Sequence, residues 1–174
     1  LLHDQEKWIE LINRYLKINK GMKVLDLGCG PGFFSVMLTN LKCQVIGIDY
    51  SDKMLEEARN NARKFGVNVK FQKMDVQDLA FQDETFDLII TRNVTWNLEK
   101  PVQAYKEMFR VLKRQGHLLN IDGNHYYHYQ DQDYNRAGHS DHQHMEGIDV
   151  FIIDNIAKEL KLSYVLRPQY DLDI

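Results

Sequence analysis

Three glycines that directly follow a short apolar strand constrain the fold of this chain most strongly. The predicted strand covers residues 24–27, and Gly28, Gly30 and Gly32 come immediately after it. Glycine lacks the side chain that would keep a ligand away from the backbone. A helix that begins after such a loop offers free N–H groups and a partial positive charge to an anion. The segment therefore predicts a ligand-binding turn rather than a plain connection.

Helical and extended patterns alternate along the first two thirds of the chain. Apolar residues at helical spacing predict helices, with Ser51 as an N-cap, Pro101 in a first turn, and Gly66 and Gly116 as stops, over residues 8–16, 33–40, 52–65, 101–115 and 148–160. Short apolar runs predict strands over residues 24–27, 45–48, 67–71, 86–90 and 117–121. Strands that alternate with helices predict an α/β fold with a doubly wound, mostly parallel sheet and helices on both faces.

An acidic residue closes the second predicted strand. Asp49 stands 21 positions after Gly28 (49 − 28). In dinucleotide-binding folds a carboxylate at this place accepts hydrogen bonds from the hydroxyls of an adenosine ribose. A lone strand-end Asp is usually only solvated, but the glycine loop in front of it favours a nucleoside site.

Five segments stand out at the predicted strands and the turns that follow them. They are Val24-Leu25-Asp26-Leu27-Gly28-Cys29-Gly30-Pro31-Gly32, Ile46-Gly47-Ile48-Asp49-Tyr50-Ser51 with Met54-Leu55, Met74-Asp75-Val76, Phe86-Asp87-Leu88-Ile89-Ile90-Thr91-Arg92-Asn93, and Val111-Leu112-Lys113-Arg114-Gln115-Gly116-His117-Leu118-Leu119. In this order they resemble the motifs of class I S-adenosylmethionine-dependent methyltransferases. The resemblance covers about residues 23–122. It implies a Rossmann-like methyltransferase fold with S-adenosyl-L-methionine as the cofactor.

The same resemblance implies which residues contact the cofactor. The glycine loop would accommodate the methionine part, Asp49 the ribose, and Asp75 the adenine amino group. The full set implied for cofactor binding is Asp26, Gly28, Cys29, Gly30, Gly32, Asp49, Tyr50, Ser51, Met54, Asp75, Val76 and Arg92.

The acceptor is expected to be a small molecule. The segment after the fourth predicted strand reads Thr91-Arg92-Asn93-Val94-Thr95-Trp96-Asn97, not the Asn-Pro-Pro-Tyr of amino-directed nucleic-acid methyltransferases. Trp96 lies where ligands bind in open α/β sheets and is a weak catalytic candidate, as are His125 and His128, which can titrate near neutrality. No general base is assigned, since a cofactor that carries its own electrophile needs mainly positioning.

The remainder of the chain departs from the alternating pattern. We expect one domain over 1–174, with an N-terminal helix in 1–20, a cofactor-binding core in 21–122, a polar flap in 123–147, and a C-terminal helix and partial strand in 148–174. The C-terminal hairpin that normally completes the family's sheet is expected to be absent or truncated. The flap holds several histidines, including His142 and His144, but no spacing typical of zinc ligands, so no metal is predicted.

Charge and cysteine content limit the other classes. The net charge is −3 and the pI about 6.2, so no nucleic-acid partner is expected. Cys29 and Cys43 form no CxxC pair, no apolar run has the length of a membrane span, and a cytoplasmic location is expected. Two alternatives stay open. One is an NAD-dependent Rossmann oxidoreductase, although Phe34 falls near the third glycine site of its fingerprint. The other is a non-catalytic binding module.

Overall fold

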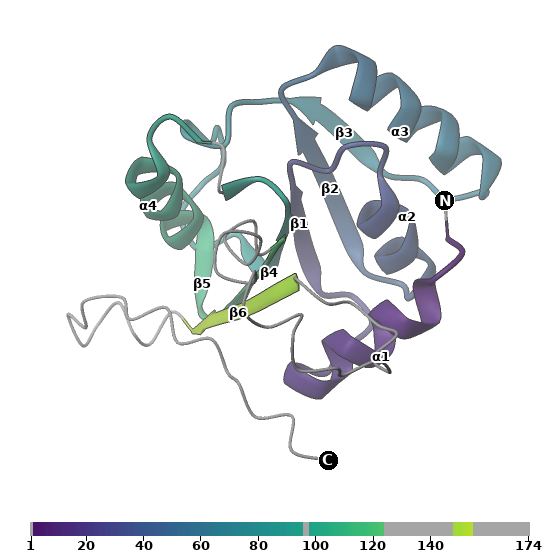
Figure 1. The fold of residues 1–174 in the computed structure, drawn as a ribbon, viewed down its shortest axis with the longest axis horizontal. Coiled ribbons are helices and arrows are strands. Elements are labelled where there is room, and N and C mark those ends of the chain that lie inside the picture. Colours follow the sequence, from purple (N-terminus) through teal and green to yellow (C-terminus); the bar gives the residue numbers. More distant parts are fainter. Residues whose placement is uncertain (1, 96–97, 124–147, 155–174) are drawn as a thin grey trace, which may run out of the picture.

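A single twisted sheet forms the centre of the molecule in the computed structural model, which describes residues 2–95, 98–123 and 148–154 (Figure 1). The strand order is β3-β2-β1-β4-β5-β6. Every pairing from β3 to β5 is parallel, and β6 is antiparallel to β5. The doubly wound, mostly parallel α/β fold predicted from the sequence is confirmed.

The helices and strands follow one another in the alternating order that the sequence pattern predicts. They are α1 (Gln5–Tyr15), β1 (Lys23–Leu27), α2 (Phe33–Asn40), β2 (Gln44–Asp49), α3 (Asp52–Lys64), β3 (Lys70–Lys73), β4 (Phe86–Arg92), α4 (Pro101–Val111), β5 (Leu112–Gly123) and β6 (Ile148–Asp154).

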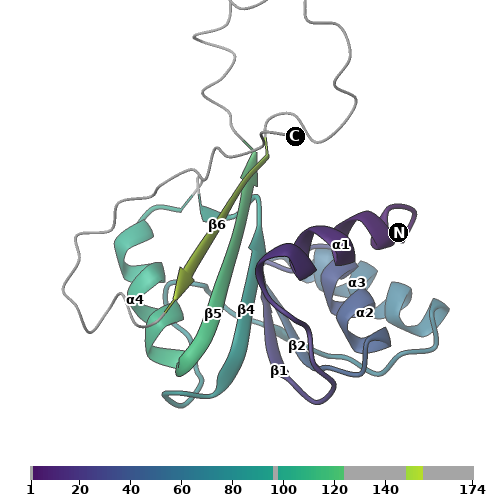
Figure 2. The same ribbon diagram turned by 90° about the horizontal axis from the view of Figure 1, so that it is seen from below.

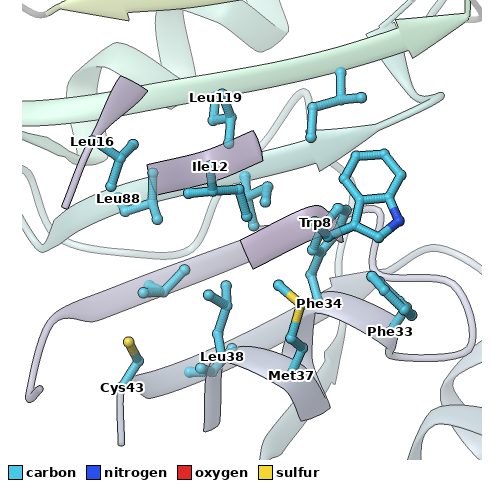
Figure 3. Packing of buried hydrophobic residues seen from close by; sticks show 14 residues of the cluster. Trp8, Ile12, Leu16, Phe33, Phe34, Met37, Leu38, Cys43, Leu88 and Leu119 are labelled. Carbon is cyan, nitrogen blue, oxygen red and sulfur yellow. The ribbon is translucent and has the colours of Figure 1, made fainter. Parts of the chain in front are cut away.

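Helices cover both faces of the sheet. Figure 2 shows α1, α2 and α3 on one face and α4 on the other. Each face has its own buried apolar cluster, one built from α1 and α2 against the central strands and one from α4. In the first cluster Trp8 meets Phe33 and Phe34 edge-on, and Ile12, further along α1, is fully buried in the same cluster (Figure 3). This packing fixes α1 beside the start of α2.

Local signals placed several element ends correctly. Ser51 is the N-cap of α3 and accepts a hydrogen bond from the Met54 amide at 3.4 Å. Gly66 follows that helix with φ +66°, the left-handed conformation that glycine adopts without strain. The next strand starts later than the predicted residue 67, at Lys70, because the Val67 amide still bonds back to Ala62 at the helix end.

The prediction that Gly116 ends a helix is wrong. The helix α4 ends at Val111, and β5 begins at once with Leu112 beside Phe86. The next pair is Leu88 with His117, so four residues of β5 lie opposite the single residue Asp87, and three of them are extra and form a bulge. Gly116 lies in this bulge, where an added Cβ would stand 2.7 Å from Leu112 Cδ1. Its glycine signal reflects a strand irregularity instead of a helix stop.

The helix predicted over 148–160 is also wrong where the structure describes it. Residues Ile148–Asp154 form β6, which pairs antiparallel with β5 from His117 to Gly123. A short apolar run fits a strand as well as a helix, and the open edge of β5 offers backbone partners that decide the matter. The described part of the sheet therefore extends beyond β5 by one antiparallel strand, at the place where a helix was expected. One such strand is compatible with the expected truncated hairpin.

Arg110 on α4 fastens the long connection between β3 and β4. Its guanidinium donates to the carbonyls of Leu79 and Phe81, both at 2.7 Å, and to the carboxylates of Asp83 and Glu107. The side chain of Arg110 is 31% exposed and that of Glu107 14%, so this network is partly shielded from water. The Arg110 network attaches the β3–β4 connection, which contains Asp75, to α4.

Arg110→Met is expected to lower the free energy of unfolding by about 2 kcal/mol, because several charge-assisted hydrogen bonds are lost at once. Arg114→Met serves as the control. The Arg114 side chain is 78% exposed, and its one partner among the described residues is Glu84 at 3.3 Å, so its loss should cost less than about 0.5 kcal/mol. Urea denaturation of both variants measures the difference, and equal losses would contradict the assigned role of Arg110.

Candidate functional site

The glycine loop lies between β1 and α2, at the carboxyl end of the parallel strands. Gly28 has φ +68°, and an added Cβ would stand only 2.3 Å from Val94 Cγ2 in the segment after β4. Gly30 has φ +51°, and an added Cβ there would meet no described atom within 4 Å. The loop is thus packed tightly against the chain at Gly28 and faces open space at Gly30. A ligand can approach the backbone at that second position.

Asp49 joins this loop to the end of β2. Its Oδ2 accepts the Gly30 amide at 2.8 Å, and its Oδ1 accepts the Ser51 amide at 2.9 Å. A carboxylate offers about four lone-pair positions, so each oxygen keeps one for a ligand hydroxyl. The sequence placed Asp49 in the site through its spacing alone. The structure shows that it also sets the conformation of the glycine loop.

The residues around Asp49 provide a surface for a flat ring. Tyr50 follows it directly, and the Tyr50 side chain is exposed to 74%. Lys73 Nζ lies 5.8 Å from the Tyr50 ring centroid and pairs with Asp52. Burial of so large an aromatic side chain against a ligand would stabilise the complex. Its exposure next to the Asp49 carboxylate is consistent with the adenosine subsite predicted from the sequence.

The end of β3 lies beside that of β2. The Met74 amide bonds to the Asp49 carbonyl at 3.1 Å, which places Asp75 one residue further along the same edge. Asp75 is exposed, and its Oδ1 accepts the Gln77 amide at 2.8 Å. Val76 is buried beneath it. Asp49 and Asp75 are therefore brought to neighbouring strand ends, as the predicted order of motifs requires.

Asp26 is turned into the core rather than toward the loop. It is 2% exposed, and its Oδ2 accepts both the amide and the hydroxyl of Ser35, at 2.8 and 2.6 Å. Burial raises the pKa of Asp26 to about 6, although the Ser35 hydrogen bonds and the nearby Arg92 charge oppose the rise. The predicted contact of Asp26 with the cofactor stays a prediction. What the structure shows is a carboxylate that caps the first turn of α2.

Cys29 is a structural residue of the loop. It is 7% exposed, and its amide donates to the Ile48 carbonyl at 2.8 Å, so the loop is tied to β2 through the backbone. Burial raises the pKa of the Cys29 thiol well above its usual range, and the charges of Asp26 and Asp49 add to this effect. The thiol stays protonated at neutral pH and is a poor nucleophile.

A buried polar cluster on the α4 face was missed by the sequence analysis. Asn120 Nδ2 on β5 donates to Thr95 Oγ1 at 3.0 Å and to the Tyr105 hydroxyl at 3.1 Å. Asn120 is 2% exposed and Thr95 9%. The signal was an Asn in the middle of an otherwise apolar strand. The cluster fixes the segment that follows β4 to the neighbouring strand and to α4.

The remaining predicted candidates lie outside the described residues. These are Trp96, His125, His128 and almost all of the polar flap over 123–147. Among the residues that the structure does describe, no group of three or more His, Cys, Asp or Glu side chains is arranged to hold a metal ion. Within the same part of the chain, no helix is both long and apolar enough to cross a membrane.

A parallel sheet with a glycine loop after β1 and a carboxylate at the end of β2 is typical of nucleoside-binding α/β domains. A family described as a methyltransferase domain matches residues 18–162, and the chain belongs to this family. The resemblance stated from the motifs is therefore confirmed.

Two relatives and one solved structure illustrate the similarity. The uncharacterized methyltransferase YcgJ of Bacillus subtilis is 35% identical over 101 residues, which are 58% of this chain and 40% of that protein. The ubiquinone/menaquinone biosynthesis C-methyltransferase UbiE of Haemophilus ducreyi is 36% identical over 110 residues, 60% of this chain and 42% of UbiE. A SAM-dependent methyltransferase from Aquifex aeolicus superimposes with a TM-score of 0.62 at 30% identity and covers 71% of this chain and 65% of that one. The chain thus spans about two fifths of the two relatives.

Proposed function

We propose that this chain binds S-adenosyl-L-methionine and transfers its methyl group to a small-molecule acceptor. The observation that carries the proposal is the open space in front of Gly30, whose amide is held by the Asp49 carboxylate. An added Cβ at Gly30 would meet no described atom, so packing within the protein does not require a glycine here. The φ of +51° favours glycine, and the missing side chain leaves room for a ligand beside the backbone. Membership of the methyltransferase-domain family supports the same assignment.

The residues present fit this cofactor. The free lone pairs of Asp49 would accept the ribose hydroxyls, Asp75 would accept the adenine amino group, and Tyr50 would cover the adenosine. The wider set proposed to line the cofactor is Asp26, Gly28, Cys29, Gly30, Gly32, Ser51, Met54, Val76 and Arg92. The cofactor itself supplies an electrophilic sulfonium methyl. The protein's part is to bind it, to orient it toward the acceptor and to exclude water.

The acceptor is proposed to approach over the segment that follows β4. The Asn120 cluster fixes Thr95 in this segment, and a fixed position is what an in-line transfer requires. Relatives named as a ubiquinone/menaquinone biosynthesis C-methyltransferase and a demethylmenaquinone methyltransferase make an aromatic quinol the first acceptor to test. The net charge of −3 supports a small molecule over duplex nucleic acid, and we also propose a cytoplasmic location.

Asp49→Ala is expected to weaken binding of S-adenosylhomocysteine by about 10- to 150-fold, the worth of about 1.5–3 kcal/mol of hydrogen bonds to a charged group. Asp52→Ala is the matched control. This variant also removes one negative charge, three residues from Asp49, but the Asp52 carboxylate is exposed and pairs with Lys73. Isothermal titration calorimetry measures both. If the two variants lose the same affinity, general electrostatics and not the ribose contact explain the effect.

Methyl transfer itself needs its own assay, because a binding module would pass the first test. Cofactor labelled in the methyl group is incubated with the protein and pooled small metabolites, including quinols. Label that moves into an organic product only with active protein supports an enzyme. Tight cofactor binding without transfer to any pool would favour the non-catalytic module.

A further inference from the structure

Gln77 joins the segment that follows β3 to the start of α4. The Gln77 residue is partly buried, and its Oε1 accepts the backbone amide of Lys100 at 2.7 Å. Lys100 is the N-cap residue of α4 and lies 23 positions further along the chain. Gln77 also follows Asp75 by only two residues. One side chain therefore ties the segment that contains Asp75 to the first turn of α4.

The Lys100 amide fixes the orientation of the Gln77 side-chain amide. A backbone N–H can only donate, so the Gln77 oxygen faces Lys100 and the Nε2 group is turned toward Asp75. Gln77 Nε2 lies 3.2 Å from Asp75 Oδ1 and 3.4 Å from Asp75 Oδ2. The reversed orientation would place two donors together at Lys100 and would bring an amide oxygen against the Asp75 carboxylate. The attachment to α4 therefore presents a hydrogen-bond donor to Asp75.

The two oxygens of Asp75 are held unequally. Oδ1 accepts the backbone amide of Gln77 at 2.8 Å and the side-chain Nε2 at 3.2 Å, whereas the contact of Oδ2 with Nε2 is the longer one, at 3.4 Å. Asp75 is exposed, so Oδ2 is the oxygen that is better placed to accept a hydrogen bond from a ligand. An acceptor held in a fixed position discriminates against a base that presents another acceptor, because the buried polar groups are then left unpaired.

We propose that Gln77 positions the Asp75 carboxylate for the exocyclic amino group of the cofactor's base, and thereby sets the preference of the site for an adenosine over an inosine. This assignment rests on the proposed function, which gives Asp75 a contact with the base. Gln77 acts through Asp75 and is a positioning residue. Its bond to Lys100 also attaches the base subsite to α4, the helix that follows the segment over which the acceptor is proposed to approach.

The test compares two ligands that differ in the base. S-Adenosylhomocysteine carries the amino donor at C6, and S-inosylhomocysteine carries a carbonyl oxygen there. Calorimetry of the wild type should show a preference for S-adenosylhomocysteine of about 10-fold or more. Gln77→Leu removes both side-chain hydrogen bonds and is expected to reduce this preference by about 3- to 10-fold, mainly through weaker binding of S-adenosylhomocysteine. Gln103→Leu is the matched control, because Gln103 is exposed on the first turn of α4, and it should shift neither affinity by more than about twofold.

Gln77→Glu separates positioning of Asp75 from attachment of α4. It keeps an oxygen for the Lys100 amide but sets a second carboxylate against Asp75 in place of the donor, so at pH 7.5 the preference should fall at least as far as in Gln77→Leu. If Gln77→Glu binds both ligands as the wild type does, Gln77 serves only the attachment and the assignment is overturned. It is equally overturned if Gln77→Leu weakens both ligands by the same factor, or if the wild type binds both with equal affinity. A wild type that binds neither ligand would overturn the proposed function, and this assignment with it.

Discussion

Gly30→Ala is expected to lower affinity for S-adenosylhomocysteine by about 10-fold or more while costing only about 1 kcal/mol of folding stability. The cost in stability arises from placing an L-residue at φ +51°. The cost in affinity arises because the new methyl group would occupy the open space where the cofactor is proposed to approach. Calorimetry gives the affinity and urea denaturation the stability of the same preparation.

Two other glycines make this prediction specific. Gly66, with φ +66° and an equally open position, lies after α3 away from the loop, so Gly66→Ala should cost the same stability and no affinity. Gly28→Ala should instead cost about 2–4 kcal/mol, because its Cβ would collide with Val94 at 2.3 Å in addition to the backbone strain. If Gly30→Ala and Gly66→Ala bind S-adenosylhomocysteine equally well, the space at Gly30 is not a ligand site.

Asp26→Asn is expected to gain stability relative to the wild type as pH rises from about 4 to 7. Burial raises the pKa of Asp26 from 3.8 to about 6 in the folded protein. A raised folded pKa means that the stability contribution is present below pH 3.8 and is lost as pH rises through 6. The change corresponds to about 3 kcal/mol at about 1.36 kcal/mol per pKa unit. Asparagine keeps an oxygen to accept the Ser35 amide and carries no charge to bury.

Asp87 provides the opposite case for the same experiment. Burial acts to raise its pKa, but hydrogen bonds from Lys113 Nζ and the Lys23 amide outweigh this effect and lower it. Asp87→Asn should therefore destabilise the protein by a nearly constant amount from pH 7 to about 4, and by less only as pH falls below 3.8. Denaturation midpoints of both variants from about pH 3 to 7 measure the two trends. Parallel trends for Asp26→Asn and Asp87→Asn would show that the buried environment assigned to Asp26 is wrong.

The sequence was most informative where local signals and periodicity agreed. The predicted helix over 33–40 matches α2 residue for residue, and Ser51 caps α3 as its side-chain chemistry predicts. Parallel strands need a crossover, so the mostly parallel sheet followed from the alternation of elements. The glycine loop and Asp49 were placed together because sequence spacing and sheet topology fix both at one edge.

Where the sequence failed, contacts between distant segments decided the structure. The apolar pattern over 148–154 is compatible with a helix or a strand, and pairing with the edge of β5 stabilises the strand. From the sequence alone Gly116 is indistinguishable from a glycine that ends a helix, because the bulge opposite Asp87 depends on strand pairing. The stacking of Arg92 on Trp8 joins residues 84 positions apart (92 − 8), and no local pattern indicates it. The same holds for Asn120 and Thr95, whose side chains meet only through strand pairing.

The measurement that bears most directly on the proposed function is a pair of calorimetric titrations of the wild-type protein, one with S-adenosylhomocysteine and one with NAD. The geometry of Gly30 and Asp49 predicts saturable one-site binding of S-adenosylhomocysteine and no measurable heat of binding for NAD. Asp49→Ala, titrated alongside, should lose most of the signal. Saturable NAD binding with no response to S-adenosylhomocysteine would contradict the proposal and favour an oxidoreductase built on the same sheet.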